Sequence, residues 1–161
     1  MCTADPIRPA TASDLAAMNV MVLRAKAHWG YDADFMAAAT DELTHSADEL
    51  GDDLVVWANS LAVLGMAKVS VSGEMAQLDS LFIDPKGMGQ GIGAALFRWA
   101  ATRARDQGAN VMRIDSDPFA EAFYLHMGAI RVGDVPSGSI PGRLLPLLDY
   151  ALDQPTKAPQ S

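Results

Sequence analysis

Residues 84–94 read Asp84-Pro85-Lys86-Gly87-Met88-Gly89-Gln90-Gly91-Ile92-Gly93-Ala94, and this stretch decides how the chain is interpreted. An apolar run of strand-like pattern ends just before it, and a run of helical pattern begins inside it. Glycines let a backbone turn tightly and bring bare N–H groups close to a ligand. A helix N-terminus adds unpaired N–H donors and a partial positive charge. The stretch therefore predicts an anion site, most often one for phosphate.

Two familiar phosphate loops share features with this stretch. A Walker A loop ends in Gly-Lys-Ser/Thr, whereas Lys86 lies on the wrong side of the glycines. The dinucleotide pattern G-x-G-x-x-G/A matches Gly89 to Ala94, but that fingerprint joins a strand to its first glycine by a very tight turn in a parallel sheet. Here Pro85 intervenes and antiparallel-type strands precede the loop. A nicotinamide-dependent enzyme is therefore a distant third hypothesis, and a merely flexible loop is the non-functional alternative.

The length and the net charge of the chain limit the classes of function that it can have. The chain has 161 residues, 50% hydrophobic and 20% charged, which suits one globular domain with a real core. The formal net charge is −8, and residues 1–53 hold ten acidic and three basic side chains, a net of −7. This acidity argues against nucleic acid as a partner, because a basic face is the usual footprint of such binding.

Several further classes are excluded by particular residue types. Cys2 is the only cysteine, so there is neither an internal disulfide framework nor a cysteine-based zinc site. The three histidines are scattered without metal-ligand spacing. No apolar run approaches the roughly 18–20 residues that span a membrane, and the first residues lack the layout of a signal peptide. We therefore expect a cytoplasmic protein with no metal and no membrane partner.

Hydrophobic periodicity and turn signals divide the chain into short elements. The expected helices cover residues 11–27, 34–45, 91–107 and 117–127, and the expected strands cover residues 7–8, 54–57, 61–72, 75–83, 111–114, 129–132 and 144–150. The order β-α-α-β-β-β-α-β-α-β-β predicts an α/β fold with a mixed sheet and helices on both faces. We expect a single domain over residues 5–150 and a mobile tail over residues 151–161.

Two segments of the chain resemble the GNAT superfamily of acetyl-CoA-dependent N-acetyltransferases. The family signature Arg/Gln-x-x-Gly-x-Gly/Ala corresponds to Met88-Gly89-Gln90-Gly91-Ile92-Gly93, preceded by the family-like Leu81-Phe-Ile-Asp-Pro85. Met88 departs from the pattern, which removes a side-chain contact but no backbone amide. The second signature corresponds to Asp117-Pro-Phe-Ala120-Glu-Ala-Phe123-Tyr124-Leu-His-Met-Gly128-Ala129. Two signatures in the right order are far more specific than either alone. Residues 28–31 and 137–143 also look like a bacterial GNAT subgroup.

The resemblance implies transfer of an acetyl group from acetyl-CoA to a primary amine by direct attack, without a metal. A splayed strand over residues 78–83 would leave backbone N–H groups free for the acetyl carbonyl or the pantetheine arm. The residues implied to bind acetyl-CoA are Leu81, Phe82, Ile83, Met88, Gly89, Gln90, Gly91, Ile92, Gly93, Ala94, Asp117 and Ala120.

The resemblance also assigns roles in the chemistry. Tyr124 matches the family's general acid, since a phenol can protonate a departing thiolate, and its alternative role is ring packing in the core. Asp79 is the most plausible carboxylate for binding the amine or for acting as a base through water, with a plain strand carboxylate as the alternative. By the period of two along a strand, we expect Asp79 and Gln77 on the same face as Leu81, where Gln77 would orient the substrate.

The acceptor side is less defined. In the family the first two helices wall the acceptor pocket, so Trp29 and Tyr31 either contact the acceptor or pack. Arg143 either binds a substrate anion or fixes a C-terminal loop, whereas His45 and His126 have no such context. The acceptor is a small-molecule or peptide amine, cationic if the acidic first third lines the pocket. Homodimers are common in the family, and a non-catalytic CoA-binding or regulatory domain is the alternative function.

Overall fold

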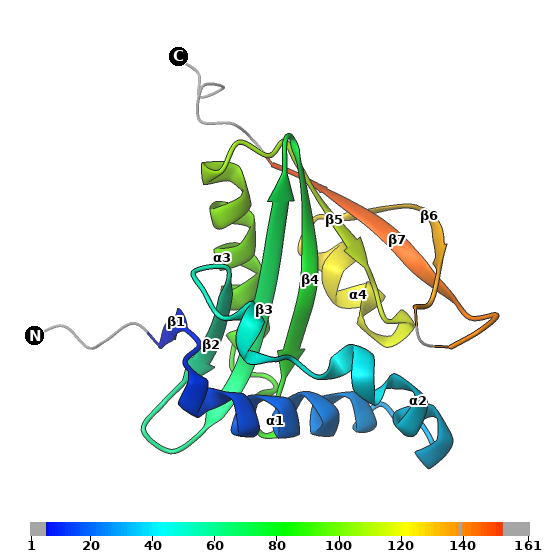
Figure 1. The fold of residues 1–161 in the computed structure, drawn as a ribbon. Helices are drawn as coiled ribbons and strands as arrows, with labels where there is room; N and C mark the ends of the chain where they lie inside the picture. Colours follow the sequence, from blue (N-terminus) through cyan, green and yellow to red (C-terminus); the bar gives the residue numbers. More distant parts are fainter. Residues whose placement is uncertain (1–5, 139, 153–161) are drawn as a thin grey trace, which may run out of the picture.

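The computed structural model describes residues 6–138 and 140–152, and the elements follow the predicted order (Figure 1). The strands are β1 (Ile7–Pro9), β2 (Leu54–Ala58), β3 (Val63–Ser72), β4 (Met75–Ile83), β5 (Val111–Asp115), β6 (Ile130–Pro136) and β7 (Leu144–Ala151). The helices are α1 (Leu15–Ala27), α2 (Ala33–Leu43), α3 (Ile92–Asp106) and α4 (Glu121–His126). The short 3₁₀ turns are η1 (Ala12–Asp14), η2 (Ala47–Glu49), η3 (Pro85–Gly87) and η4 (Pro118–Ala120).

The observed bounds of a few helices and strands differ from the predicted bounds. The second helix ends at Leu43 rather than His45, and the helix expected from Asp117 begins with the turn η4 before α4. At the C-terminal side, β7 continues to Ala151 and Leu152 is buried. The folded part therefore extends past the expected boundary at residue 150, and the rest of the expected tail lies outside the described residues.

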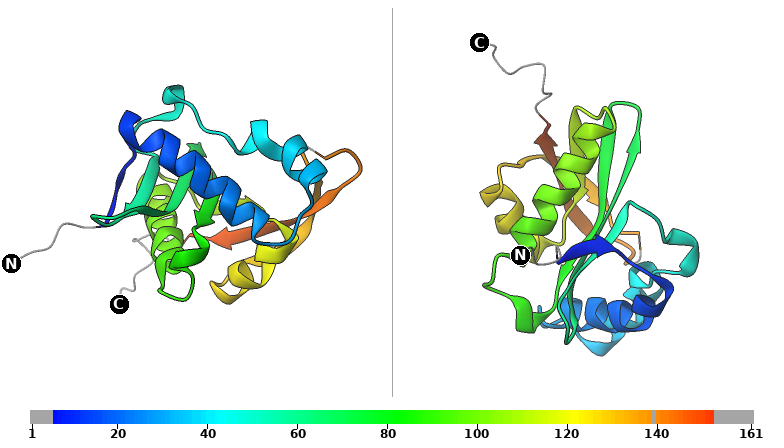
Figure 2. Two further views of the ribbon diagram at one scale, coloured as in Figure 1. Left: turned by 90° about the horizontal axis from the view of Figure 1, so that it is seen from below. Right: turned by 90° about the vertical axis from the view of Figure 1, so that its left-hand side faces the viewer.

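Within the described residues the strands form one seven-stranded sheet in the order β1-β2-β3-β4-β5-β7-β6. β4 and β5 run parallel, and every other neighbouring pair is antiparallel, so the predicted mixed sheet is confirmed. Helices α1 and α2 pack on one face, and α3 and α4 pack on the other (Figures 1 and 2).

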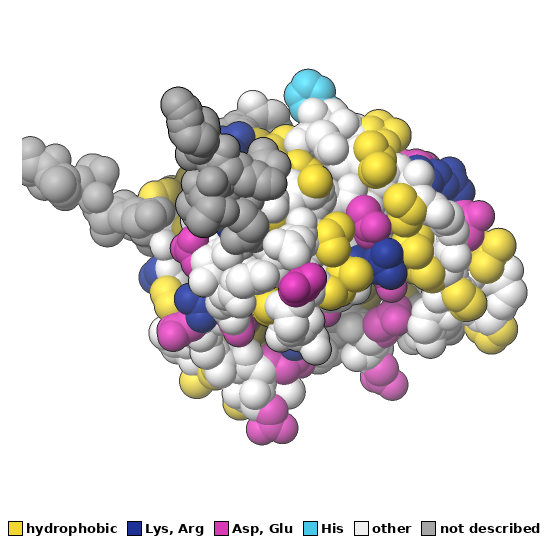
Figure 3. Space-filling view, turned by 90° about the horizontal axis from the view of Figure 1, so that it is seen from above, with side chains coloured by type: hydrophobic (Ala, Val, Ile, Leu, Met, Phe, Trp, Pro, Cys, Tyr) yellow, Lys and Arg dark blue, Asp and Glu magenta, His cyan; other side chains and the backbone are white. Residues whose placement is uncertain are grey.

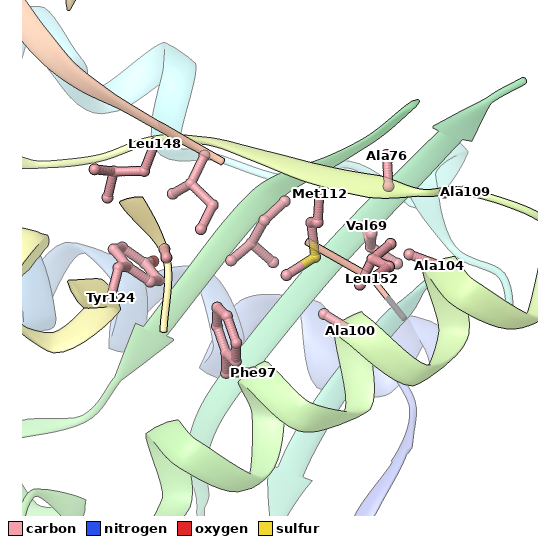
Figure 4. Packing of buried hydrophobic residues seen from close by; sticks show 13 residues of the cluster. Val69, Ala76, Phe97, Ala100, Ala104, Ala109, Met112, Tyr124, Leu148 and Leu152 are labelled. Carbon is pink, nitrogen blue, oxygen red and sulfur yellow. The ribbon is translucent and has the colours of Figure 1, made fainter. Parts of the chain in front are cut away.

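Helix α3 is held on the sheet by apolar side chains spaced three or four residues apart. Phe97, Ala100 and Ala104 are fully buried, and they point toward Val69 and Met112 (Figure 4). An apolar stripe of this period is what makes a surface helix amphipathic. Because the stripe fixes α3 along its length, it also fixes the N-terminal end of that helix, where the glycine loop lies.

The sheet is split between its central strands, β4 and β5. They pair only from Met75 to Leu78 and from Val111 to Ile114, and beyond that point they diverge (Figure 1). Just past the end of β4, the Asp84 N–H donates to the Leu64 carbonyl of β3 at 2.8 Å. Backbone groups alternate in direction along a strand, so the N–H groups of residues 81 and 83 point to the open side. This agrees with the expected splayed strand.

A β-bulge interrupts β4 at Asp79. Lys68 of β3 pairs with Ser80 and the next residue, Val69, pairs with Leu78, so Asp79 is the extra residue. An extra residue shifts the face of every residue that follows it. Leu81 therefore packs on the α3 side, and the expectation that it shares a face with Gln77 is wrong. The assumption of a regular period of two caused the error.

A buried ion pair ties the glycine loop to α1. Asp84 has a side chain only 1% exposed, and it accepts from Arg24 Nε at 3.0 Å and from the Lys86 amide at 2.9 Å. Burial alone would raise the pKa of Asp84, but Arg24 and the Lys86 amide outweigh burial and hold the pKa below its usual value. The carboxylate is thus charged at neutral pH and anchors the loop.

The outer surface mixes charges of both signs. Figure 3 shows a face on which acidic and basic side chains lie beside one another among hydrophobic ones. Two of the ion pairs in the structure are Arg113–Asp149 at 2.8 Å and Arg131–Glu121 at 3.4 Å. In the part of the chain that the structure describes, no helix is long and apolar enough to cross a membrane.

We predict that Arg24→Gln destabilises the fold because it leaves the Asp84 carboxylate buried without its cation. Breaking a fully buried pair costs about 3–5 kcal/mol, and because Arg24 is 45% exposed we expect about 2–3 kcal/mol in the free energy of unfolding. The matched control is Arg103→Gln, whose partner Asp53 is 46% exposed, and it should cost less than about 1 kcal/mol.

Urea unfolding at several pH values measures both variants. The folded-state pKa of Asp84 is lowered, so its stabilisation is complete above the unfolded pKa of about 3.9 and is lost as the pH falls below it. The gap between wild type and Arg24→Gln should therefore close in acid. Equal losses in the Arg24 and Arg103 variants at pH 7 would show that the Asp84 pair does not anchor the loop.

Candidate active site

A cleft of about 680 Å³ opens where β4 and β5 part. Its walls come from α1, α2, β4, the glycine loop, the start of α3, β5, the η4–α4 segment and the β6–β7 connection. Gln90 and Tyr31 do not line it. The predicted site residues that do line it are Trp29, Gln77, Asp79, Leu81, Phe82, Ile83, Met88, Gly89, Gly91, Ile92, Gly93, Ala94, Asp117, Ala120, Tyr124 and Arg143.

The glycine loop presents open backbone at the N-terminus of α3. Gly89 and Gly91 both have a φ of +80°, which L side chains rarely adopt. A Cβ at either position would meet nothing within 4 Å, so the backbone borders open space. Ala95 donates to the Gly91 carbonyl at 3.0 Å as the first bond of the helix. The N–H groups of residues 92–94 therefore have no partner within the helix and can meet an anion.

The loop is also held by its own hydrogen bonds. The Gln90 side-chain amide donates to the Lys86 carbonyl at 3.1 Å, which occupies it within the loop. Met88 is 38% exposed on the cleft wall, where the signature has Arg or Gln. The groups that this loop offers to an anion are thus backbone N–H groups.

Tyr124 lies between the hydrophobic core and the cleft. Its ring is 6% exposed and packs 5.3 Å from the Phe123 ring and 6.0 Å from the Phe97 ring, centre to centre (Figure 4). Its side chain also lines the cleft, and no described residue hydrogen-bonds its hydroxyl group. Burial, helped by the charge of Asp117, raises the pKa of Tyr124 far above 10, so the phenol stays protonated. Both roles considered for Tyr124 therefore fit its position.

Three carboxylates without an ion-pair partner among the described residues line the cleft: Glu42 of α2, Asp79 of β4 and Asp115 of β5. Gln77 donates to Asp115 at 3.4 Å. Between residues 6 and 53, the part of the first third that the structure describes, Glu42 is the only acidic residue that lines the cleft. The acidity of the cleft therefore comes mainly from the strands, and the surplus of acids in residues 1–53 is not its source.

The Asp79 carboxyl group, in an exposed residue, has a pKa above the usual value of an aspartate. Shielding by the cleft walls raises its pKa, and the negative charges of Glu49 and Asp115 raise it further. A hydrogen bond from Ser70 and the charge of Lys68 offset this only in part. Asp79 therefore loses its charge at a higher pH than an ordinary aspartate.

A cluster of four polar side chains closes the wall at the end of β5. The Asp117 carboxylate is 11% exposed, accepts from the Tyr31 hydroxyl at 3.0 Å and is ion-paired with Lys26. Arg143 donates to the Tyr31 oxygen at 2.5 Å. Burial would raise the pKa of Asp117, but Lys26, the Phe119 amide and Tyr31 lower it. The same desolvation and the Asp117 charge raise the pKa of Tyr31 to about 12.

Two residues with open roles lie in this cluster. Arg143 ties the segment before β7 to Tyr31 and also lines the cleft, so both roles considered for it fit its position. Tyr31 packs, because its ring stacks on Phe35 at 3.9 Å, whereas Trp29 stacks on Phe119 at 5.6 Å and still lines the cleft.

Comparison with known families identifies the family of the chain that forms this cleft. The sequence profile of the acetyltransferase (GNAT) domain family matches residues 22–137, more than half of the chain. The chain belongs to the GNAT acetyltransferase family. The resemblance seen in the two glycine-containing signatures is thereby confirmed. No curated protein sequence matches this GNAT chain.

Solved structures share the GNAT fold at low sequence identity. A GCN5-related N-acetyltransferase from Rhodopseudomonas palustris superposes with a TM-score of 0.74 at 18% identity, over 94% of this chain and 99% of that one. The PaiA N-acetyltransferase from Thermoplasma acidophilum, solved with coenzyme A, has a TM-score of 0.69 at 16% identity over 90% and 97%. The ribosomal-protein-S18-alanine N-acetyltransferase from Escherichia coli has 0.65 at 18% over 92% and 94%.

Sequence reasoning missed several residues that line the cleft of this GNAT domain. Asp115 had a readable signal, because it ends a strand parallel to β4 and such ends meet at one sheet edge. The others are brought in by helix packing or by the bulge, for which the regular period of two gives no signal. The missed residues include Lys26, Phe35, Glu42, Ser80, Asp115 and Phe119.

Proposed function

We propose that this GNAT domain transfers the acetyl group of acetyl-CoA to a cationic primary amine. The observation that carries the proposal is the parted pair of strands, which opens one cleft onto a glycine-lined helix N-terminus, two free strand amides and three unpaired carboxylates. Acetyl transfer needs an anion site, an oxyanion site and an amine site in one continuous space.

The residues at the glycine loop fit a CoA pyrophosphate. The free N–H groups of residues 92–94 and the positive end of α3 would hold its charge, and the bare Gly89 and Gly91 let it approach the backbone. Acetyl-CoA would supply the activated thioester, and the remaining chemistry falls to groups of the chain.

The strand and the cleft walls would then do three things. The outward N–H groups of residues 81 and 83 donate to the acetyl carbonyl or to the pantetheine amides. The Asp79 carboxylate, supported by Asp115 and Glu42, binds the ammonium group of the acceptor. Once the ammonium group has given one proton to a base, its nitrogen bonds to the acetyl carbon and the carbon–sulfur bond breaks. The Tyr124 proton passes to the departing sulfur, which leaves as a thiol, and the Tyr124 oxygen takes up the second proton that the nitrogen loses.

The alternative is a domain that binds CoA without turnover. The carboxylates without an ion-pair partner and the phenol at the cleft wall favour the enzyme, because a binding module has no need of them. Free-thiol release from acetyl-CoA, screened over cationic, neutral and anionic amines of small-molecule and peptide type, separates the two. Release with cationic amines supports the proposal, whereas binding by calorimetry with no release from any amine supports the binding domain.

The first test of the site concerns the anion loop. In Gly91→Asp a carboxylate would face the bound pyrophosphate, and we expect acetyl-CoA binding to be lost in calorimetry. The control is Gly91→Asn, since Asn and Asp both tolerate a positive φ and differ only in charge. The Asp variant should bind at least about tenfold more weakly than the Asn variant. Wild-type affinity in a folded Gly91→Asp protein would move the pyrophosphate elsewhere.

The Tyr124 hydroxyl is tested by Tyr124→Phe, which keeps the ring packing. We expect kcat to fall by about 10–10²-fold, at the low end for general acids because a thiolate is a fair leaving group. The KM for acetyl-CoA should change little. Tyr150→Phe is the control, because Tyr150 packs against Phe97 at 4.9 Å but does not line the cleft. Unchanged kcat in Tyr124→Phe would leave Tyr124 a packing residue.

Asp79→Asn tests the amine site. Loss of the charge should raise the KM for a cationic amine by about tenfold, worth roughly 1.4 kcal/mol, and leave the KM for acetyl-CoA unchanged. Because the pKa of Asp79 is raised, wild-type amine binding should weaken on acidification from a higher pH than an ordinary aspartate allows. Asp106→Asn, at an exposed helix end, is the control. An equal KM for the amine in both variants contradicts the assignment.

A further inference from the structure

His45 is a buried imidazole for which the proposed reaction has no use. It follows α2 and is only 7% exposed. Its backbone N–H donates to Asn19 Oδ1 and its carbonyl accepts from Asn19 Nδ2, both at 2.9 Å. Two bonds from α1 therefore fix the position of a ring that has almost no contact with solvent.

Each ring nitrogen of His45 has a partner. Nδ1 lies 2.8 Å from Glu49 Oε1, and Nε2 lies 3.4 Å from Ser80 Oγ. Burial would raise the pKa of Glu49, but bonds from His45, from Lys68 at 2.9 Å and from the Ser46 amide at 3.0 Å lower it to about 2. A charged carboxylate only accepts hydrogen bonds, so Nδ1 carries the proton and Nε2 is left to accept from the Ser80 hydroxyl.

Ser80 carries this arrangement to the cleft. It lines the cleft directly after Asp79, and it pairs across the strands with Lys68, whose ammonium group holds Glu49. The order hydroxyl, imidazole, carboxylate is the arrangement in which a buried base is oriented by one neighbour and acts through the other. Here the hydroxyl lies beside the carboxylate assigned to the amine.

We infer that Ser80, His45 and Glu49 form a relay that removes the first proton from the acceptor ammonium group held by Asp79. The inference rests on the proposed acetyl transfer. An N–H bond of the ammonium breaks and its proton passes to Ser80 Oγ, while the Ser80 hydroxyl proton passes to His45 Nε2. The products of this step are a neutral amine and an imidazolium ion, and no electron is gained or lost.

Charged and polar side chains from four elements surround the His45 ring. The charged groups of this network are Glu49 from η2 and Lys68 from β3, Asp79 of β4 interacts with both through its charge, and α1 contributes the neutral Asn19. Glu49 stabilises the imidazolium ion while Lys68 limits that stabilisation. Ser80 is the group that touches the amine, and His45 and Glu49 act through it. The second amine proton leaves during acetyl transfer, on the side of Tyr124.

The pH profile of kcat/KM for a cationic amine tests the relay. Without His45 only amine that is already deprotonated in solution can react, so His45→Gln should lose about 10²-fold at pH 7. The deficit should shrink as the pH rises and vanish near the amine pKa of about 10. Ser80→Ala should show the same pH dependence and Ser80→Thr should restore activity. The double variant should be no slower than His45→Gln.

The controls are His126→Gln and Ser72→Ala, both at exposed positions outside the cleft, and both should keep the wild-type profile. A purely structural role for His45 or Ser80 would lower kcat/KM by the same factor at every pH. That result, additive losses in the double variant, or wild-type profiles in both single variants would each overturn the relay.

A second measurement needs no turnover. Long-range proton–nitrogen correlation spectra of the wild-type imidazole should show a protonated Nδ1 and a bare Nε2 in His45, and a protonated Nε2 would overturn the relay. A wild type that releases no thiol with any amine overturns the proposed function, and the relay with it. A wild type that turns over while the variants keep its pH profile overturns the relay alone.

Discussion

The parting of β4 from β5 is the constraint on which this molecule depends, and helix α1 holds it in place. Each strand is followed by a buried carboxylate, Asp84 after β4 and Asp117 after β5. Both carboxylates are ion-paired with the last turn of α1, one with Arg24 and the other with Lys26. One helix end therefore spans the gap. Because burial makes the loss of either cation costly, the diverging ends of the two strands are held at a fixed separation beyond the point where they stop pairing.

The ion pairs at the end of α1 also decide which charged groups of the cleft remain without a partner. Lys26 and Arg143 are the only basic side chains among the described residues on its walls. Both are ion-paired with Asp117, and Arg143 also donates to the Tyr31 oxygen. The carboxylates of Glu42, Asp79 and Asp115 have no such partner there. A site can thus attract cations although its walls carry both signs, because ion pairing has neutralised one of them. Net charge along the sequence cannot reveal this, since it counts paired and unpaired groups alike.

The sequence predicts the order of elements, the mixed sheet and the loop at the start of α3, because these follow from local periodicity and from glycines that need a positive φ. It also places Tyr124 on the cleft wall through the second signature. What it does not predict are contacts between residues far apart in the chain. Lys26 meets Asp117 across 91 positions, and His45 meets Ser80 across 35. Such pairs depend on how helices dock on the sheet, for which no local pattern exists.

The bulge at Asp79 nevertheless has a cue in the sequence, because Leu78 and Leu81 are three positions apart. In a regular strand they would face opposite sides, yet both pack on the α3 side. If β4 alternated regularly from Asp79 to Leu81, these two residues would share a face. The Asp79 carboxylate would then enter the apolar layer between the sheet and α3, and it would lose its hydration. One extra residue resolves the conflict: both leucines stay in the core, and the two polar residues between them line the cleft. An Asp-Ser pair between two core leucines therefore specifies a bulge, and the bulge places the carboxylate proposed to bind the amine beside the hydroxyl of the proposed relay.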